Sequence, residues 1–521
     1  HAPGSAPARF AAGLFQFTWF GGNIWLRLLL SRIVVAVASP CPGIIILRLR
    51  GVYSPLLTLA LSALAYTPAF RWTAVTGGED GLGGLKRGNI GTFNLDNALN
   101  YYIVVAVLSL GVLYLLLRLV RSPFGHVLVA IRENQLRAGF QGYPVERYKL
   151  GVFVISAVVT GFAGALFGFQ NYLVSAEAVS VPFSGELLAI VVIGGMRSML
   201  GPALGALFFM LFRELFSIWT SDWLLWFGLV FVAFVLFSPD GLVGIWARLS
   251  KRWWPAPEES AAMSRRKIYD GLPLPVFLVP KNRAGTVLEV DGVSKSFGGI
   301  RAVNDASLKI GAGEIHALIG PNGAGKTTLF NLVSGLYATD GGTIKLGGRE
   351  IQGVPSDRIC HQGLARSFQI TNLFKGLSIY ENLRLSLQAH SGMRFNLWRD
   401  IDEYERIHAE TAELVKFLGL EGIEAIEGGE LSYGGQRLVD LGIALGSKPQ
   451  VLLLDEPLAG LAAAERERVA NLVKNIAANI PVLIVEHDID RVLGFSHQVT
   501  VMNQGEVLMT GTSDAVRADR K

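Results

Sequence analysis

Long apolar runs without charged residues fill the first half of the chain. The four clearest runs cover residues 51–70, 97–117, 150–176 and 223–239. A helix of roughly 20 apolar residues crosses a hydrocarbon core of about 30 Å. Buried helices of a soluble domain are the alternative, but several such runs in succession disfavour it. The pattern therefore predicts a polytopic α-helical membrane domain.

Two further apolar stretches are interrupted. Residues 33–47 form a shorter run that contains Pro40 and Pro42. The stretch 187–211 is broken by glycines, an arginine and a proline between residues 194 and 202. Because such residues interrupt a helix, we expect two pieces there, the first of them a half-helix.

The pattern changes in the second half. From residue 286, short β-like runs separated by glycine turns give way to alternating helices and apolar strands, as in an α/β nucleotide-binding domain. Residues 251–285 are rich in proline, alanine, serine and charge, which indicates a linker. We therefore expect a membrane domain at 1–250, a linker at 251–285 and a P-loop α/β domain at 286–521.

Composition supports this division. The 521 residues are 51% hydrophobic and only 17% charged, which is too apolar for an ordinary soluble protein. The net charge of +5 does not indicate a nucleic-acid partner, because the basic residues lie in loops and are not interleaved with aromatics. With only Cys41 and Cys360, neither a disulfide framework nor a zinc site is available.

Basic residues concentrate in the loop that follows the run 97–117. Its cations outnumber Glu133 and Glu146 and are Arg118, Arg121, Arg132, Arg137, Arg147 and Lys149. By the positive-inside rule this loop is cytoplasmic, and so is everything after Pro239. Residues 129–139 of the loop show a short amphipathic helical pattern. We expect it to dock on the soluble domain; an ordinary solvated loop helix is the alternative.

Residues 320–328 carry the strongest chemical signal. They fit the phosphate-binding pattern G-x-x-x-x-G-K-[ST], and they follow a strand-like run and precede a helical one. Such glycines turn N–H groups toward phosphate oxygens, Lys326 supplies a positive charge for the β and γ phosphates, and Thr327 offers a hydroxyl to Mg²⁺. The predicted nucleotide-binding residues are Gly320, Asn322, Gly323, Gly325, Lys326, Thr327 and Thr328.

Residues 451–457 read as a buried strand that ends in two acids. Asp455 is placed to hold Mg²⁺, and Glu456 is placed one residue further on to polarise an attacking water. The pair also occurs in other P-loop ATPases, so by itself it leaves the family open.

Residues 431–436, LSYGGQ, decide the family. With the phosphate loop they resemble the ATP-binding cassette (ABC) family, whose LSGGQ-type signature binds the γ-phosphate held by a second cassette. The resemblance implies that Ser432, Gly434, Gly435 and Gln436 contact ATP in a cassette dimer. It also implies that Phe297 stacks on adenine, that Gln369 is the Q-loop glutamine and reaches Mg²⁺, and that His487 is the switch histidine. Ala462 stands where many cassettes carry an acidic residue.

The membrane half is similar to permeases of branched-chain amino-acid importers. The similarity rests on the stretches 48–55, 76–82, 122–126, 130–133, 193–195, 201–205 and 239–242. The cassette half, including 365–370 and 456–461, resembles the ATP-binding subunit of the same importers. This implies a permease fused to an ATPase in the inner (plasma) membrane, with the ATPase cytoplasmic. The implied partners are a second permease, a second cassette, an extracytoplasmic solute-binding protein and the lipid membrane. By the same comparison, we expect the chain to begin inside the permease and to end before the last cassette helix.

Three other functions fit parts of the sequence. The same type of permease resembles importers of urea and short amides, and nothing in residues 1–245 distinguishes the cargo. A regulatory membrane protein that binds nucleotide without turnover is disfavoured by the complete set Lys326, Asp455, Glu456 and His487. An exporter is disfavoured because the loops are short.

Overall fold

The computed structural model describes residues 24–49, 51, 53–90, 93–253, 271–280, 285–368, 372–486 and 492–518. Contacts divide the chain into two compact units: residues 1–117 with 146–257, and residues 118–145 with 258–521. The segment between two membrane-type helices thus groups with the second unit. The predicted domain boundaries remain a prediction.

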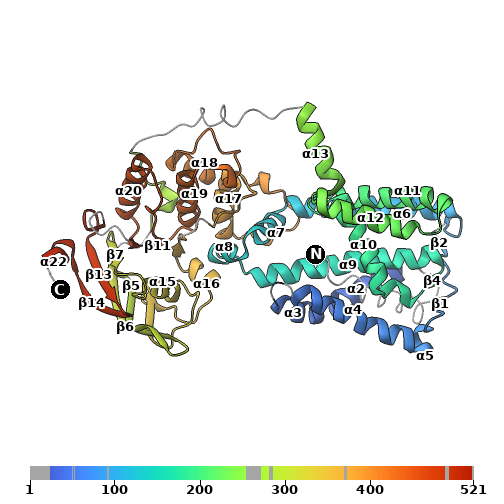
Figure 1. The fold of residues 1–521 in the computed structure, drawn as a ribbon, viewed down its shortest axis with the longest axis horizontal. Helices are drawn as coiled ribbons and strands as arrows, with labels where there is room; N and C mark the ends of the chain where they lie inside the picture. The colour runs from blue at the N-terminus through green and yellow to red at the C-terminus, as the bar shows by residue number, and fades with distance from the viewer. Residues whose placement is uncertain are drawn as a thin grey trace. The chain divides into compact units, whose positions relative to one another are not determined.

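The first unit is helical, as expected (Figure 1). Its helices are α2 (Ile24–Ala38), α3 (Pro40–Arg48), α4 (Tyr53–Arg71), α5 (Thr73–Thr76), α6 (Ala98–Arg121), α9 (Val145–Asn171), η1 (Ala176–Val179), α10 (Val181–Gly194), α11 (Gly201–Trp219), α12 (Trp223–Phe237) and α13 (Gly241–Trp253). Two short antiparallel pairs join β1 (Leu82–Gly83) with β4 (Leu173–Val174), far apart in the sequence, and β2 (Asn89–Ile90) with β3 (Phe93–Asn94).

Four helices of the described part are long and apolar enough to cross a membrane, or five if the bent pair Trp223–Phe237 and Gly241–Ser250 forms one span. The four are Leu28–Arg48, Ala98–Arg121, Val145–Asn171 and Gly201–Trp219. The run 51–70 forms helix α4 but is not among them, because its serine, threonine, tyrosine and proline residues lower its mean hydropathy. That the run 51–70 crosses the membrane stays a prediction.

The interrupted stretch 187–211 forms two helices, as expected. Helix α10 ends at Gly194 and α11 begins at Gly201. The backbones meet so closely that a Cβ on Gly205 would lie 2.0 Å from the carbonyl oxygen of Ile190. Phe209, Phe212 and Phe227 pack beside this contact. Small residues thus let the two helices pair tightly.

The second unit contains two sheets. The larger has the strand order β10-β11-β12-β7-β13-β14, with β14 antiparallel to β13 and the other pairs parallel. Its strands are β7 (Ile315–Ile319), β10 (Leu364–Arg366), β11 (Val451–Asp455), β12 (Val482–Val485), β13 (Gln498–Asn503) and β14 (Glu506–Thr512). An antiparallel sheet has the order β6-β5-β8-β9 and consists of β5 (Thr286–Phe297), β6 (Ile300–Gly311), β8 (Gly341–Leu346) and β9 (Arg349–Glu350).

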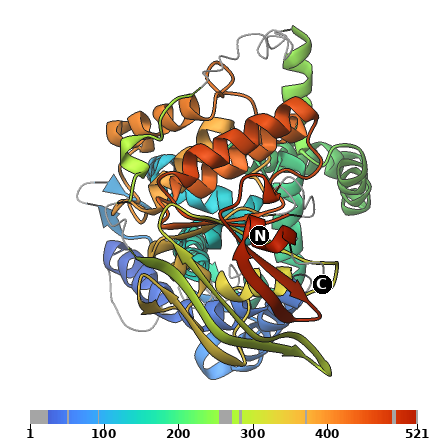
Figure 2. The same cartoon turned by 90° about the vertical axis from the view of Figure 1, so that its left-hand side faces the viewer.

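The helices of the second unit fall into two sets. Helices α17 (Ile379–Ala389), α18 (Glu405–Phe417) and α19 (Tyr433–Gly446) pack on one another, and Figure 1 shows them side by side. Figure 2 shows the strands of this unit after a 90° turn of the view. The remaining helices are α7 (Pro123–Glu133), α8 (Gln135–Phe140), η2 (Val276–Leu278), α15 (Lys326–Val333), α16 (Ser356–His361), η3 (Ile401–Glu403), η4 (Gly428–Glu430), α20 (Ala463–Ala477) and α22 (Ser513–Ala518).

Part of the sequence between the two halves packs onto the second unit. Leu274 and Leu278 are buried in its largest apolar cluster, together with residues of α17, α18 and α19. The side-chain amide of Asn475 donates a hydrogen bond to the carbonyl oxygen of Leu272 at 2.7 Å. Residues 271–280 are therefore a fixed part of this unit.

Candidate functional site

Strands β7 and β11 end at the same edge of the sheet, because both are parallel to β12 between them. Carboxyl ends of parallel strands are where α/β folds bind ligands. The phosphate loop follows β7, and the acidic pair ends β11. The sheet therefore brings together two motifs that are far apart in the sequence.

The phosphate loop needs its glycines. Gly323 and Gly325 have φ angles of 82° and 97°, which are costly for residues with a side chain. A Cβ on Gly325 would also lie 2.4 Å from the carbonyl oxygen of Ala302. Gly325 then caps α15, whose first N–H groups face the loop, so the backbone forms a cradle for an anion.

Lys326 lies inside this cradle. Its Nζ donates hydrogen bonds to the carbonyl oxygens of Gly320 at 2.7 Å and Pro321 at 2.9 Å. Burial lowers the pKa of Lys326, and the negative charges of Glu456 and Asp455 oppose that shift. Both acids therefore act on the Lys326 charge, as expected from a sheet that places the end of β11 near the phosphate loop.

Asp455 and Glu456 differ in environment. Asp455 is buried, and its Oδ2 accepts a hydrogen bond from Arg366 Nη2 at 3.2 Å. Burial raises the pKa of Asp455, while the Arg366 charge opposes the shift. Glu456 has a φ of 49°, which is strained for a residue other than glycine, and such strain is concentrated at functional sites.

The donors near the loop fit Mg²⁺. Thr327 lies exposed in the first turn of α15, and Asp455 adds a carboxylate. Hydroxyl and carboxylate oxygens are the ligands that Mg²⁺ prefers, with water and phosphate oxygens completing its shell. Within the described residues no group of three or more His, Cys, Asp or Glu side chains could hold a metal ion.

The signature residues form the start of α19. Ser432 is the N-cap, and its Oγ accepts a hydrogen bond from the Gly435 N–H at 3.3 Å. A Cβ on Gly434 would lie 2.4 Å from the carboxyl carbon of Glu465, so a larger residue there would displace the end of that flexible side chain. Gln436 donates from Nε2 to the Leu431 carbonyl oxygen at 3.0 Å. The segment thus presents a serine hydroxyl and glycine amides at a helix N-terminus.

Phe297 lies at the end of β5 and is 44% exposed, as a side chain that stacks on a base must be. Its ring meets Tyr337 edge-on, with 5.3 Å between centroids. Gln369 and His487 lie outside the described residues. Ala462 is the N-cap of α20 and makes no side-chain capping bond. An acidic side chain at an N-cap accepts such a bond from the first N–H groups of the helix.

Buried charges around the site had not been singled out from the sequence. Arg366 precedes Gln369 by three residues, and Arg437 and Asp440 lie in the helix that starts with the signature; all three are buried. Arg437 donates to the Phe368 carbonyl oxygen at 2.6 Å and to the Tyr433 hydroxyl at 2.9 Å. Charged residues within the apolar helical pattern of 433–446 were the available signal, since such residues are rarely buried without a partner.

The loop segment 118–145 docks on the cassette, as its pattern predicted. Helix α7 contacts α17, and α8 contacts α16. Gln388 donates to the Pro123 carbonyl oxygen at 3.0 Å, Tyr143 donates its hydroxyl to the Leu385 carbonyl oxygen at 2.7 Å, and His361 bonds the Gly142 carbonyl oxygen at 2.7 Å. We call residues 118–145 the docking segment.

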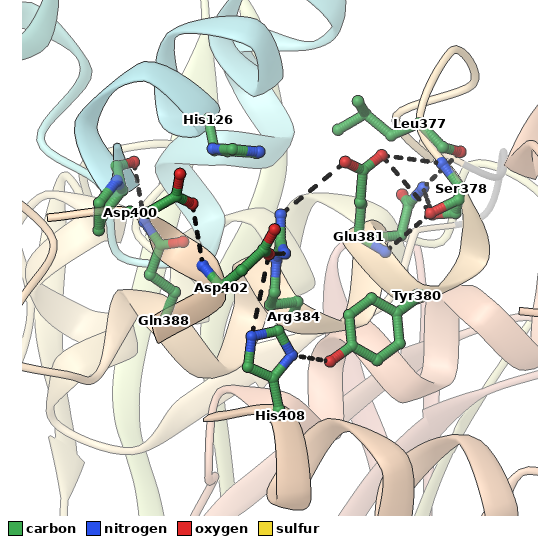
Figure 3. A network of polar contacts seen from close by, with 12 residues as sticks. His126, Leu377, Ser378, Tyr380, Glu381, Arg384, Gln388, Asp400, Asp402 and His408 are labelled. Carbon is green, nitrogen blue, oxygen red and sulfur yellow. Dashed lines mark hydrogen bonds and ion pairs between the residues drawn. The ribbon is translucent and has the colours of Figure 1, made fainter. Parts of the chain in front are cut away.

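A polar network lies beside the contact between the docking segment and α17 (Figure 3). Arg384 pairs with Asp402 at 3.1 Å and with Glu381 at 3.8 Å, and Tyr380 bonds His408. His126 of α7 is placed above Arg384 in Figure 3. Burial lowers the pKa of His126, and the positive charge of Arg384 lowers it further. The neutral form of His126 therefore suits this position.

Together, a phosphate loop, an acidic strand end and a signature helix on this fold define the ATPase of an ABC transporter. Comparisons support the class for each half. The family of branched-chain amino acid transport system permease components matches residues 6–239, and the ABC transporter family matches residues 303–459.

Two ATP-binding proteins give the same result for the second half of the chain. The high-affinity branched-chain amino acid transport ATP-binding protein BraF of Pseudomonas aeruginosa is 36% identical over 244 residues, which cover 44% of this chain and 93% of that protein. The LivG protein of Escherichia coli, with the same description, is 35% identical over 240 residues, 44% of this chain and 93% of its own. A nucleotide-free ABC cassette crystal structure is 29% identical and covers 45% of this chain and 96% of its own, with a TM-score of 0.41. The chain belongs to the branched-chain amino acid ABC transporter family, as a permease fused to an ATPase.

Proposed function

We propose that this chain is half of an importer that uses ATP hydrolysis to move branched-chain amino acids across the inner (plasma) membrane. The observation that carries the proposal is the covalent continuity of membrane-type helices with a cassette on which the intervening loop is docked. A second permease and a second cassette complete the transporter, and an extracytoplasmic solute-binding protein delivers the cargo.

The cassette residues take the following roles in this proposal. Lys326 and the loop amides bind the β and γ phosphates, Phe297 stacks on adenine, and Ser432 with Gly434 contacts the γ-phosphate bound by the other cassette. Thr327, Gln369 and Asp455 hold Mg²⁺, which when bound neutralises charge on the phosphates. Glu456 accepts a proton from the attacking water, and His487 orients that water and the γ-phosphate.

Transport follows from closure of the two cassettes. Each ATP lies between one phosphate loop and the signature of the other subunit, so binding draws the cassettes together. The docking segment moves with the cassette because its contacts are made by buried residues such as Tyr143. We propose that this movement switches the permease pair between outward and inward access.

Uptake by the reconstituted assembly tests the proposal. Proteoliposomes that contain this chain, its partner subunits and the binding protein should accumulate labelled leucine, isoleucine or valine when ATP is supplied on the cassette side, and not with ADP. Labelled urea and acetamide are the comparison cargoes. Uptake of urea or acetamide without leucine would replace the proposed cargo, and ATP binding without hydrolysis would indicate a regulatory protein instead.

A further inference from the structure

The backbone just before Gln369 is held by side chains from two other elements. The carbonyl oxygen of Arg366 accepts a hydrogen bond from Arg137 Nη1 at 3.2 Å. Two residues later, the N–H of Phe368 donates to Asp440 Oδ2 at 3.3 Å. The Phe368 ring also packs edge-on against Phe140, with 5.0 Å between centroids. The position of this strand end therefore depends on the docking segment and on α19.

Arg137 is the docking-segment residue in this arrangement. It is only 1% exposed, and its Nη2 lies 3.0 Å from Asp440 Oδ1 and donates to the Asp440 carbonyl oxygen at 3.1 Å. A buried ion pair contributes little net stability, since desolvation offsets the attraction. The planar guanidinium of Arg137 instead holds several acceptors in place at once, which a lysine ammonium does not do. The pair is thus better suited to positioning than to stabilisation.

Arg366 connects this contact to the acidic strand end. Its backbone is bound by Arg137, while its own guanidinium reaches Asp455 Oδ2 at 3.2 Å. The same guanidinium donates to Asn331 Oδ1 at 2.6 Å and Ser334 Oγ at 2.8 Å, both on or next to α15. The side chain is almost fully buried, so these bonds leave it little freedom.

We infer that Arg366 is a positioning residue through which Arg137 of the docking segment sets the Asp455 carboxylate. The inference rests on the proposed function, in which Asp455 holds Mg²⁺. Displacement of the docking segment pulls on the Arg366 carbonyl oxygen, moves its guanidinium and changes how Asp455 is presented. The same path, followed in reverse, makes the docking segment respond to the bound nucleotide, because coupling between two sites is reciprocal.

A double-mutant cycle on nucleotide affinity tests this path without any measurement of turnover. The probe is AMP-PNP, a hydrolysis-resistant ATP analogue, with Mg²⁺, titrated into the full chain in detergent. We expect Arg137→Gln to raise the dissociation constant by at least about 5-fold, the lower end of typical coupling. In the Arg366→Met background the same change should have no further effect, because the path is already cut. Without Mg²⁺, in EDTA, the variants should bind equally.

Further variants separate positioning from folding. Arg137→Gln leaves Asp440 buried without its Arg137 partner. The pair Arg137→Gln with Asp440→Asn tests whether affinity stays low after that charge is removed, as we expect. Arg137→Lys keeps the charge and should give an intermediate affinity; it replaces Arg137→Gln if that variant does not fold. Arg132→Gln is the matched control, since Arg132 is 57% exposed on the same segment and pairs with its neighbour Glu133.

Each outcome bears on the inference. Equal losses from Arg137→Gln in the two backgrounds, or full affinity in the Arg137→Gln and Asp440→Asn pair, would overturn it. Failure of the unchanged chain to bind AMP-PNP would overturn the proposed function as well. Normal binding by the unchanged chain with additive variants would overturn only the inference.

Discussion

The backbone N–H of Glu456 donates a hydrogen bond to the carbonyl oxygen of Val485 at 2.9 Å. Val485 is the last residue of β12, and Glu456 directly follows β11. Two neighbouring strands therefore hold Glu456 at the edge of the sheet, in a conformation with a φ of 49°. Its side chain direction is set by the sheet and not by a flexible loop.

Glu456→Gln should abolish hydrolysis and leave nucleotide binding intact. The amide keeps the shape of the carboxylate but cannot take the proton of an attacking water, which costs about 10²–10⁴-fold in rate. ATPase turnover of the assembled transporter and AMP-PNP affinity are the two measurements. Glu467→Gln on the exposed surface of α20 is the control. Turnover within a factor of a few of the unchanged protein would refute the role of Glu456.

Phe297→Ala should weaken nucleotide binding. Loss of base stacking costs about 1–3 kcal/mol, so the KM for ATP should rise about 5- to 150-fold. Phe297→Trp should bind nearly as well, because it keeps an aromatic face. Phe395→Ala removes another exposed phenylalanine, 42% exposed against 44% for Phe297, and should leave KM unchanged. If Phe395→Ala matched Phe297→Ala, the adenine contact would have to be sought elsewhere.

His390 should make the cassette less stable in mild acid. Burial, followed by the positive charge of His361, lowers its pKa from 6.5 to about 4. His390 is the C-cap of α17, where the helix dipole favours a cation, but that effect is worth only about 0.3–1 kcal/mol and burial dominates. Between the two pKa values the unfolded chain binds more protons, so stability is complete above pH 6.5 and declines as pH falls toward 4.

The magnitude follows from the size of the shift. About 2.5 pKa units correspond to about 3 kcal/mol. Urea unfolding of the full chain, monitored on the cassette transition at pH 7.5 and pH 4.5, should show a smaller acid loss for His390→Gln than for the unchanged protein. An equal acid loss in both proteins would show that His390 is not the group responsible.

Leu278→Ala should destabilise the cassette. Leu278 is 2% exposed within the apolar cluster, and truncation of a buried leucine costs about 2–5 kcal/mol in lost burial and cavity formation. Val276→Ala, two residues earlier and 87% exposed, should change stability by less than about 0.5 kcal/mol. The midpoint of urea unfolding measures both. Equal, small effects would mean that residues 271–280 do not belong to the cassette core.

Several features could be predicted from the sequence because each depends on a short stretch of chain. The phosphate loop requires glycines at fixed offsets between a strand and a helix. The strand, the loop and the helix follow one another directly around residues 320–328. The break in 187–211 was likewise predictable, since Gly194 and Gly201 mark the ends of two helices. The membrane character of the first unit followed from runs of about 20 residues.

The sequence alone thus determined the two types of domain, and it predicted the nucleotide site and the docking of residues 129–139. The tertiary structure decided how these parts are joined. Arg137 and Asp440 are 303 residues apart, yet they form a buried pair, and Arg366 reaches Asp455 across two parallel strands. Such contacts depend on the order of the strands and on which helix covers which edge of the sheet. No local pattern of residues encodes them, because two charged residues become partners only when the folded chain buries them side by side.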